Sequence, residues 1–187
     1  MIRPLRTAAL AVLVLSLAAP AFAAQKRMVT YDAASPTARR LTGAGLTFVF
    51  TKSLLRTRIY AVRATAVAVG VVPRPSTDGE VNRKLDALMG ADARTGSLYE
   101  IDPQVQEGRV MIAAFCPGST KGWLSIGPVG TRRDLQVVAF GDDPATGEPR
   151  LCGDMLFSFH GEWRMPGPMN DGVTDRVFAP DYGQPGS

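Results

Sequence analysis

The sequence predicts an α+β domain built mainly from an antiparallel β-sheet, with one packed helix over about residues 78–89. Segments rich in β-branched and aromatic residues recur through the chain, whereas only one segment combines helical spacing of apolar residues with a capping signal. In the second half, turns separate such segments so closely that antiparallel pairing is the natural assembly. The strands expected there span 109–116, 123–126, 133–140 and 151–164, with a short one around 98–101.

The first strand of the domain is expected at 46–51, where Leu46, Phe48 and Phe50 alternate onto one face. The stretch after it, 54–72, fits two periods. Its first part, 54–60, could be helix or strand, while the β-branched residues that follow favour a strand. A transmembrane span is excluded there, because the stretch contains Arg56, Arg58 and Arg63.

The expected helix has its own start and stop signals. Thr77 and Glu80 have the spacing of a capping box, and Gly90 can close the last turn. The apolar positions Val81 and Leu85 follow helical spacing. We therefore place the helix over 78–89, packed on the sheet.

Residues 1–23 have the pattern of a cleavable export signal. Arg3 and Arg6 precede an unbroken run of low polarity over 7–19, and small residues lead up to Ala23. The run has about 13 residues and a membrane-spanning helix needs about 20, so we expect cleavage between Ala23 and Ala24 rather than a retained anchor. No cysteine lies near this position, which argues against a lipid anchor. The expected location is the periplasm or the exterior, with no integral membrane segment after cleavage.

Four regions follow from these signals. The signal peptide spans 1–23, a flexible N-terminal arm 24–42, one β-rich globular domain 43–164, and a disordered tail rich in glycine and proline 165–187. The formal charge of the whole chain is +4, of which the signal contributes two arginines. The remaining +2 is too weak to indicate a nucleic-acid partner.

The two cysteines, Cys116 and Cys152, are expected to pair in an oxidising compartment. The loop between them would contribute about 3.8 kcal/mol in the chain-entropy picture. The alternative is two reduced, buried thiols. With one histidine and two distant cysteines, no zinc spacing is present, and we expect neither a metal nor a cofactor.

The only histidine, His160, lies in a row with Ser158 and Glu162 along the last expected strand. Such a row could be a nucleophile, a base and an orienting group. Residues two apart on a strand are about 6.7 Å apart, however, and their side chains stand parallel, so a solvated polar face is expected. The opposite face is expected in the core and carries Met155, Phe157, Phe159, Gly161 and Trp163.

Trp123, flanked by turns, is the one aromatic residue that could line a site.

Three further patterns have plain structural explanations. The segment 118–122 looks like an anion-binding loop, but lacks the spacing of a phosphate loop and is expected to be a hairpin turn. Acidic residues cluster over 141–148, without the spacing of a calcium loop. Arginines that could form a basic patch are expected to be scattered, because strand alternation splits them: Arg56, Arg58, Arg63, Arg132 and Arg133.

These observations favour a non-enzymatic binding or accessory domain of the cell envelope, whose partner is an envelope component or another protein. One alternative is a hydrolase-type enzyme whose site is built from dispersed carboxylates. Another is an interaction domain that adds an edge strand to a partner. The substrate or ligand is not indicated by any motif.

Overall fold

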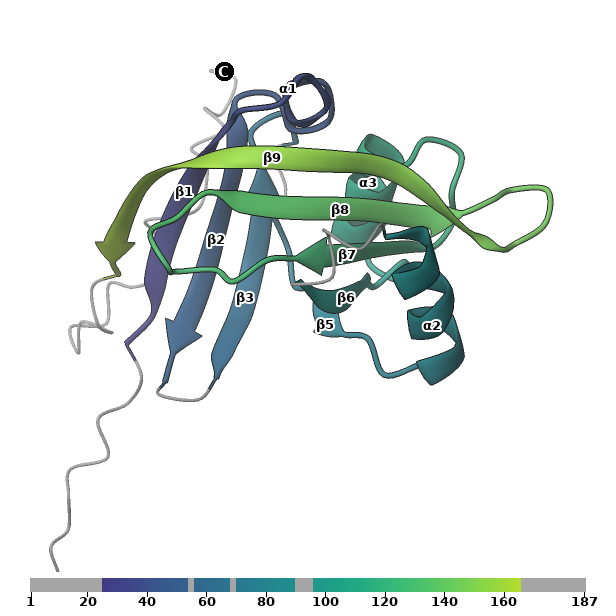
Figure 1. The fold of residues 1–187 in the computed structure, drawn as a ribbon, viewed down its shortest axis with the longest axis horizontal. Coiled ribbons are helices and arrows are strands. Elements are labelled where there is room, and N and C mark those ends of the chain that lie inside the picture. Colours follow the sequence, from purple (N-terminus) through teal and green to yellow (C-terminus); the bar gives the residue numbers. More distant parts are fainter. Residues whose placement is uncertain (1–24, 54–55, 68–69, 90–95, 166–187) are drawn as a thin grey trace, which may run out of the picture.

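The computed structural model describes residues 25–53, 56–67, 70–89 and 96–165. They form a single nine-stranded antiparallel sheet in the order β4-β3-β2-β1-β9-β8-β7-β6-β5 (Figure 1). This confirms a domain dominated by an antiparallel sheet. The strands are β1 (Arg27–Ala33), β2 (Gly45–Lys52), β3 (Thr57–Ala64), β4 (Gly70–Val71), β5 (Arg74–Pro75), β6 (Ser97–Ile101), β7 (Gly122–Ile126), β8 (Leu135–Asp142) and β9 (Pro149–Arg164).

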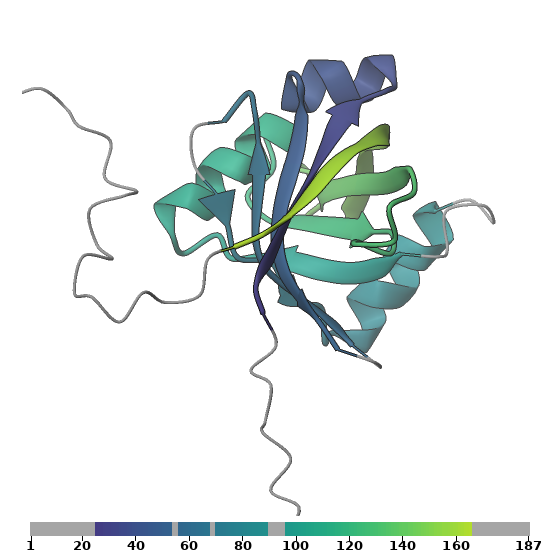
Figure 2. The ribbon, with the colours of Figure 1, turned by 90° about the vertical axis from the view of Figure 1, so that its left-hand side faces the viewer.

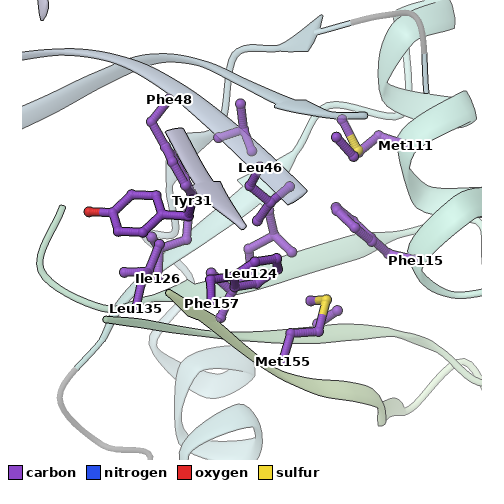
Figure 3. Close-up of a cluster of buried hydrophobic side chains, with 14 of the residues drawn as sticks. Tyr31, Leu46, Phe48, Met111, Phe115, Leu124, Ile126, Leu135, Met155 and Phe157 are labelled. Carbon is purple, nitrogen blue, oxygen red and sulfur yellow. The ribbon is translucent and has the colours of Figure 1, made fainter. Parts of the chain in front are cut away.

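The sheet curves into a half-barrel because β9 is shared by its two halves. The first part of this long strand pairs with β8, and the second part pairs with β1 (Figure 1). The inner faces of both halves therefore meet around one apolar core, which also receives side chains of α3 (Gln106–Phe115) (Figure 3). The fully buried side chains include Tyr31, Phe48, Leu124, Met111 and Phe157.

Two more helices cover other parts of the sheet. The short helix α1 (Pro36–Thr42) contributes Ala38 and Leu41 to the main core, whereas α2 (Gly79–Leu88) packs Leu85 on the outer face of the second half. All five residues of β7 are buried, because both faces of that strand are covered. The outer face of the first half, formed by β1, β2, β3 and the end of β9, has most of its side chains half-buried or exposed, with Thr51 an exception.

Three β-bulges bend the sheet. The registers skip one residue at Tyr60, at Cys152 and at His160. A bulge reverses the alternation of the residues that follow it. Phe157 therefore points into the core, whereas Trp163 points outward with 45% of its surface exposed. The expectation that Trp163 belongs to the core is wrong for this reason.

The type of structure expected for two other segments is also wrong. The segment 24–42, expected to be a flexible arm, contains the helix α1 and the strand β1, which lies beside the central strand β9. Alternation of Val29 and Tyr31 buries one face of that strand, and the Ser35 hydroxyl accepts the Ala38 amide proton at 3.1 Å to cap the helix. The segment 109–116, expected to be a strand, lies in α3 and its C-cap, because its apolar residues are buried on one helical face.

Other expectations are confirmed in detail. Strand β2 buries Leu46, Phe48 and Phe50, and the ambiguous segment 54–60 belongs to a strand from Thr57 onward. The expected helix is α2, although its N-cap is Asp78 rather than Thr77.

The expected signal 1–23, Gly90 and residues 166–187 of the expected tail lie outside the described residues. Within the described ranges, no helix has the length and apolar character needed to cross a membrane.

A disulfide joins Cys116, at the end of α3, to Cys152 in a bulge of β9, with the two Cα atoms 5.3 Å apart. The pairing agrees with the expectation from the cysteine count. Because α3 fills the concave side of the sheet, the bond fastens this helix to the strand that both halves share.

Candidate functional site

Cationic side chains gather at the end of the sheet where β1 begins and β9 ends, at the left of Figure 1. We call this group the cationic end. Among the described residues it holds eight cations against two carboxylates, Asp134 and Glu162, a formal excess of six positive charges. The rest of the described chain carries nine cations and eleven carboxylates. The cations are Lys26, Arg27, Lys52, Arg56, Arg58, Arg132, Arg133 and Arg164.

Antiparallel pairing explains why residues so far apart in sequence meet here. Arg27 lies opposite Arg164 on one side and Phe50 on the other, so the start of β1 meets the ends of β2 and β9. The hairpin between β2 and β3 adds Lys52 and Arg58 to the same end. Charges contributed by three separate parts of the chain thus share one surface.

The loop between β7 and β8 is held against this end by polar contacts. The ammonium group of Lys52 donates a hydrogen bond to the carbonyl of Gly130 at 3.2 Å. Glu162, with 8% of its side chain exposed, pairs with Arg27 at 2.9 Å and with Arg132 at 3.6 Å. One carboxylate therefore anchors two of the cations and leaves the excess charge largely uncompensated.

The outer face of the same end carries an apolar row. Met28 lies in register with Trp163 on β9 and with Val49 on β2, and Val49 pairs with Ala61 on β3. Figure 2 looks toward this side of the molecule, with β1 and β9 crossing in front. The half-buried ring of Tyr60 adjoins the row at its β3 end.

Two cations lie against Tyr60. The Lys26 ammonium and the Arg58 guanidinium are each 5.1 Å from the centre of its ring, within the range of cation–π attraction. Both side chains are exposed. The apolar row is thus bordered by accessible positive charge.

The expected scattering of the arginines is therefore wrong for four of the five that were considered. Arg56, Arg58, Arg132 and Arg133 belong to the cationic end, whereas Arg63 lies further along β3, opposite Thr47. Alternation along one strand separates neighbours, but it carries no information on which distant loop comes to lie beside that strand. That is why the sequence alone did not predict the cluster.

The row Ser158, His160 and Glu162 does not act as one unit in the structure. His160 Nδ1 lies 2.8 Å from Oδ2 of Asp32, a partner on β1 that sequence reasoning missed. Because His160 is the bulged residue, Glu162 turns to the other face and binds Arg27 instead. The imidazole also lies beside the exposed Trp163, with ring centres 6.2 Å apart.

Trp123, the aromatic residue expected to line a site, is 5% exposed and packs beneath α2. Its strand is covered on both faces, so its indole contributes to the second apolar cluster. The accessible tryptophan of the described chain is Trp163 instead.

The loop 118–122, which resembles an anion-binding loop, already holds a carboxylate of this protein. Asp142 Oδ1 accepts hydrogen bonds from the amides of Thr120 and Lys121 at 2.6 and 2.7 Å, and its Oδ2 accepts one from the Thr120 hydroxyl at 2.7 Å. Burial alone would raise the pKa of Asp142, but these hydrogen bonds outweigh it and lower the pKa below its usual value. The loop is a turn that is fastened to the end of β8.

A shallow cavity of about 430 Å³ lies between this loop and the start of α3. Its charged lining residues are Arg109 and Lys121, and no carboxylate lines this cavity. One nitrogen of Arg109 already donates to the carbonyls of Pro103 and Gln104 at 3.2 and 3.1 Å. The cavity therefore lacks the pair of carboxylates that acid–base hydrolysis would use.

The edges of the sheet offer little backbone for strand addition. Both edge strands, β4 and β5, contain two residues, and one of them includes Pro75, which has no amide proton. Among the described residues, β3 pairs with β4 at Val62 and Arg63, and the part of β3 before them carries Arg58 and the bulge at Tyr60. Charges, bulges and short edges are features that oppose edge-to-edge pairing.

No protein-family model, no curated protein and no solved structure matches this chain. Its function is therefore inferred from the surface just described.

Proposed function

We propose that this chain is an exported, non-enzymatic binding module, and that its cationic end binds an anionic component of the cell envelope. The observation that carries the proposal is the separation of charge: one end has a formal excess of six positive charges, while the remainder of the described chain is slightly negative. Such a separation orients the protein toward an anionic partner.

The position of the charges favours a partner that is larger than a single small anion. The cations lie on strand ends, on the β2–β3 hairpin and on the β7–β8 loop, and most of them are exposed. A cation near an anionic surface contributes about 1 kcal/mol, so several acting together are needed for useful affinity. An extended array of phosphate groups supplies that number of contacts.

Export is the second part of the proposal, and two features support it. The sequence begins with the pattern of a signal peptide. The disulfide between Cys116 and Cys152 is of the kind that persists in oxidising compartments. In the envelope, phosphate-bearing lipids and polymers are the abundant anions that this end would meet.

The test uses matched charge variants and polyphosphate as the soluble probe. The double variant Arg58→Gln/Arg133→Gln removes two charges from the cationic end, and Arg40→Gln/Arg83→Gln removes two exposed charges elsewhere. We expect the first to weaken binding about 30-fold at low salt and the second to leave it nearly unchanged. Equal binding by both variants would refute the proposal.

A further inference from the structure

We infer that the anionic partner is the phosphate-bearing surface of a lipid membrane, and that the outer face of the cationic end is the part that meets it. This inference rests on the proposed function and names its ligand. Its evidence is the apolar row, which a purely ionic partner would not require.

The composition of the outer face is that of a membrane-interface surface. Trp163 is 45% exposed, and Tyr60 lies at the other end of the apolar row that passes through Met28 and Val49. Tryptophan and tyrosine rings are favoured at the level of lipid headgroups, because one part of each ring system is apolar and another part forms hydrogen bonds. Four neighbouring strands thus present one aromatic and aliphatic row to the solvent.

The cations lie where headgroup phosphates would be when this row touches the bilayer. Lys26 and Arg58 flank Tyr60, each 5.1 Å from its ring centre, and both are exposed. Long cationic side chains can lay their apolar stems on a surface while the charged group stays at the polar layer. Apolar contact and charge pairing can therefore act in one orientation of the protein.

Trp163 is held in place rather than free to fold back. Its ring lies over Gly161, where a Cβ atom would come within 2.8 Å of the indole. The centre of the His160 ring lies 6.2 Å from that of Trp163, and the imidazole is itself paired with Asp32 at 2.8 Å. Its exposed edge is consequently a fixed feature of the surface.

The experiment compares vesicles with a soluble anion. The protein, purified after export, is mixed with vesicles containing phosphatidylglycerol, with vesicles of phosphatidylcholine alone, and with polyphosphate. The variant Trp163→Ser removes the exposed indole, and Leu156→Ser is the matched control, since Leu156 is 53% exposed on the same strand but lies outside the apolar row.

We expect Trp163→Ser to weaken binding to the phosphatidylglycerol vesicles about tenfold and Leu156→Ser to leave it unchanged. Neither variant should alter polyphosphate binding. The intrinsic fluorescence should shift to the blue with these vesicles, and Trp163→Ser should abolish the shift, because Trp123 is already buried.

The experiment distinguishes failure of the membrane inference from failure of the proposed function. If Trp163→Ser binds vesicles as the original chain does while Arg58→Gln/Arg133→Gln does not, the membrane inference is overturned and the proposed function stands. If Arg58→Gln/Arg133→Gln binds both polyphosphate and vesicles unchanged, the proposed function fails as well. Tight binding to phosphatidylcholine vesicles that salt does not weaken would also overturn the inference, because it would need no charge.

Discussion

Replacing Asp142 by asparagine should lower the stability of the fold by about 2 kcal/mol at neutral pH. Asparagine keeps the shape of the side chain, so its Oδ1 can still accept hydrogen bonds from the amides of Thr120 and Lys121. In the original chain these two nitrogens lie 2.6 and 2.7 Å from Asp142 Oδ1. What the change removes is the charge. A hydrogen bond to a charged group is worth about 1 kcal/mol more than a neutral one, and Asp142 accepts at least two from backbone amides.

The effect should depend on pH in a defined direction. The folded-state pKa of Asp142 is lower than its ordinary value, so its ionised form stabilises the native state. This contribution is fully present above the unfolded pKa of about 3.9, and it is lost as the pH falls through the lower folded pKa. The gap between the original chain and Asp142→Asn should therefore be constant near neutrality and close progressively below about pH 4.

Urea unfolding followed by circular dichroism measures the gap at each pH. Near neutral pH, the expected difference corresponds to a melting temperature lower by about 4–8 °C. Asp154→Asn is the control, since Asp154 is exposed and accepts a hydrogen bond from the Gln136 side chain. A difference below about 0.5 kcal/mol for Asp142→Asn, or a gap that persists unchanged into acid, would show that the charge of Asp142 does not hold the loop.

Two further predictions concern the helices. Replacing both Cys116 and Cys152 by alanine should lower the free energy of unfolding by about 3.8 kcal/mol, measured as a lower urea midpoint, and an unchanged midpoint would contradict this. Asp78→Ala should lower the free energy of unfolding by about 1 kcal/mol, measured by thermal unfolding, because the Asp78 carboxylate accepts hydrogen bonds from the amides of Glu80 and Val81 in the first turn of α2. Thr77→Ala should change it little. A larger loss for Thr77→Ala than for Asp78→Ala would show that Thr77 is the N-cap.

Sequence reasoning succeeded where one local period decided the structure. Strand β2 alternates from Leu46 to Phe50, so its three large buried side chains were predicted, and α2 combines a cap signal with helical spacing. It failed at α3, where the short apolar run Val110–Phe115 suits a buried strand as well as a buried helix. The choice between them depends on what surrounds the run, which periodicity does not report.

The candidate site depended on features that a single sequence hides. One inserted residue at His160 turned Trp163 outward and separated Glu162 from the expected polar row. The partner of His160, Asp32, lies 128 residues away along the chain. The cationic end likewise arises only when four segments that are distant in sequence come together, so the sequence shows the cations but not that they share one surface.

The cationic end is the surface that we propose binds an anionic partner. Hydrogen exchange, measured with and without phosphatidylglycerol vesicles, tests it most directly, because the open edge of β3 from Thr57 to Ala61 and the β7–β8 loop lie at this end. We predict that bound vesicles slow exchange in these two segments and leave α2, on the outer face of the other half, unchanged. Slower exchange confined to α2, or no change in either segment when the protein is fully bound, would contradict the claim.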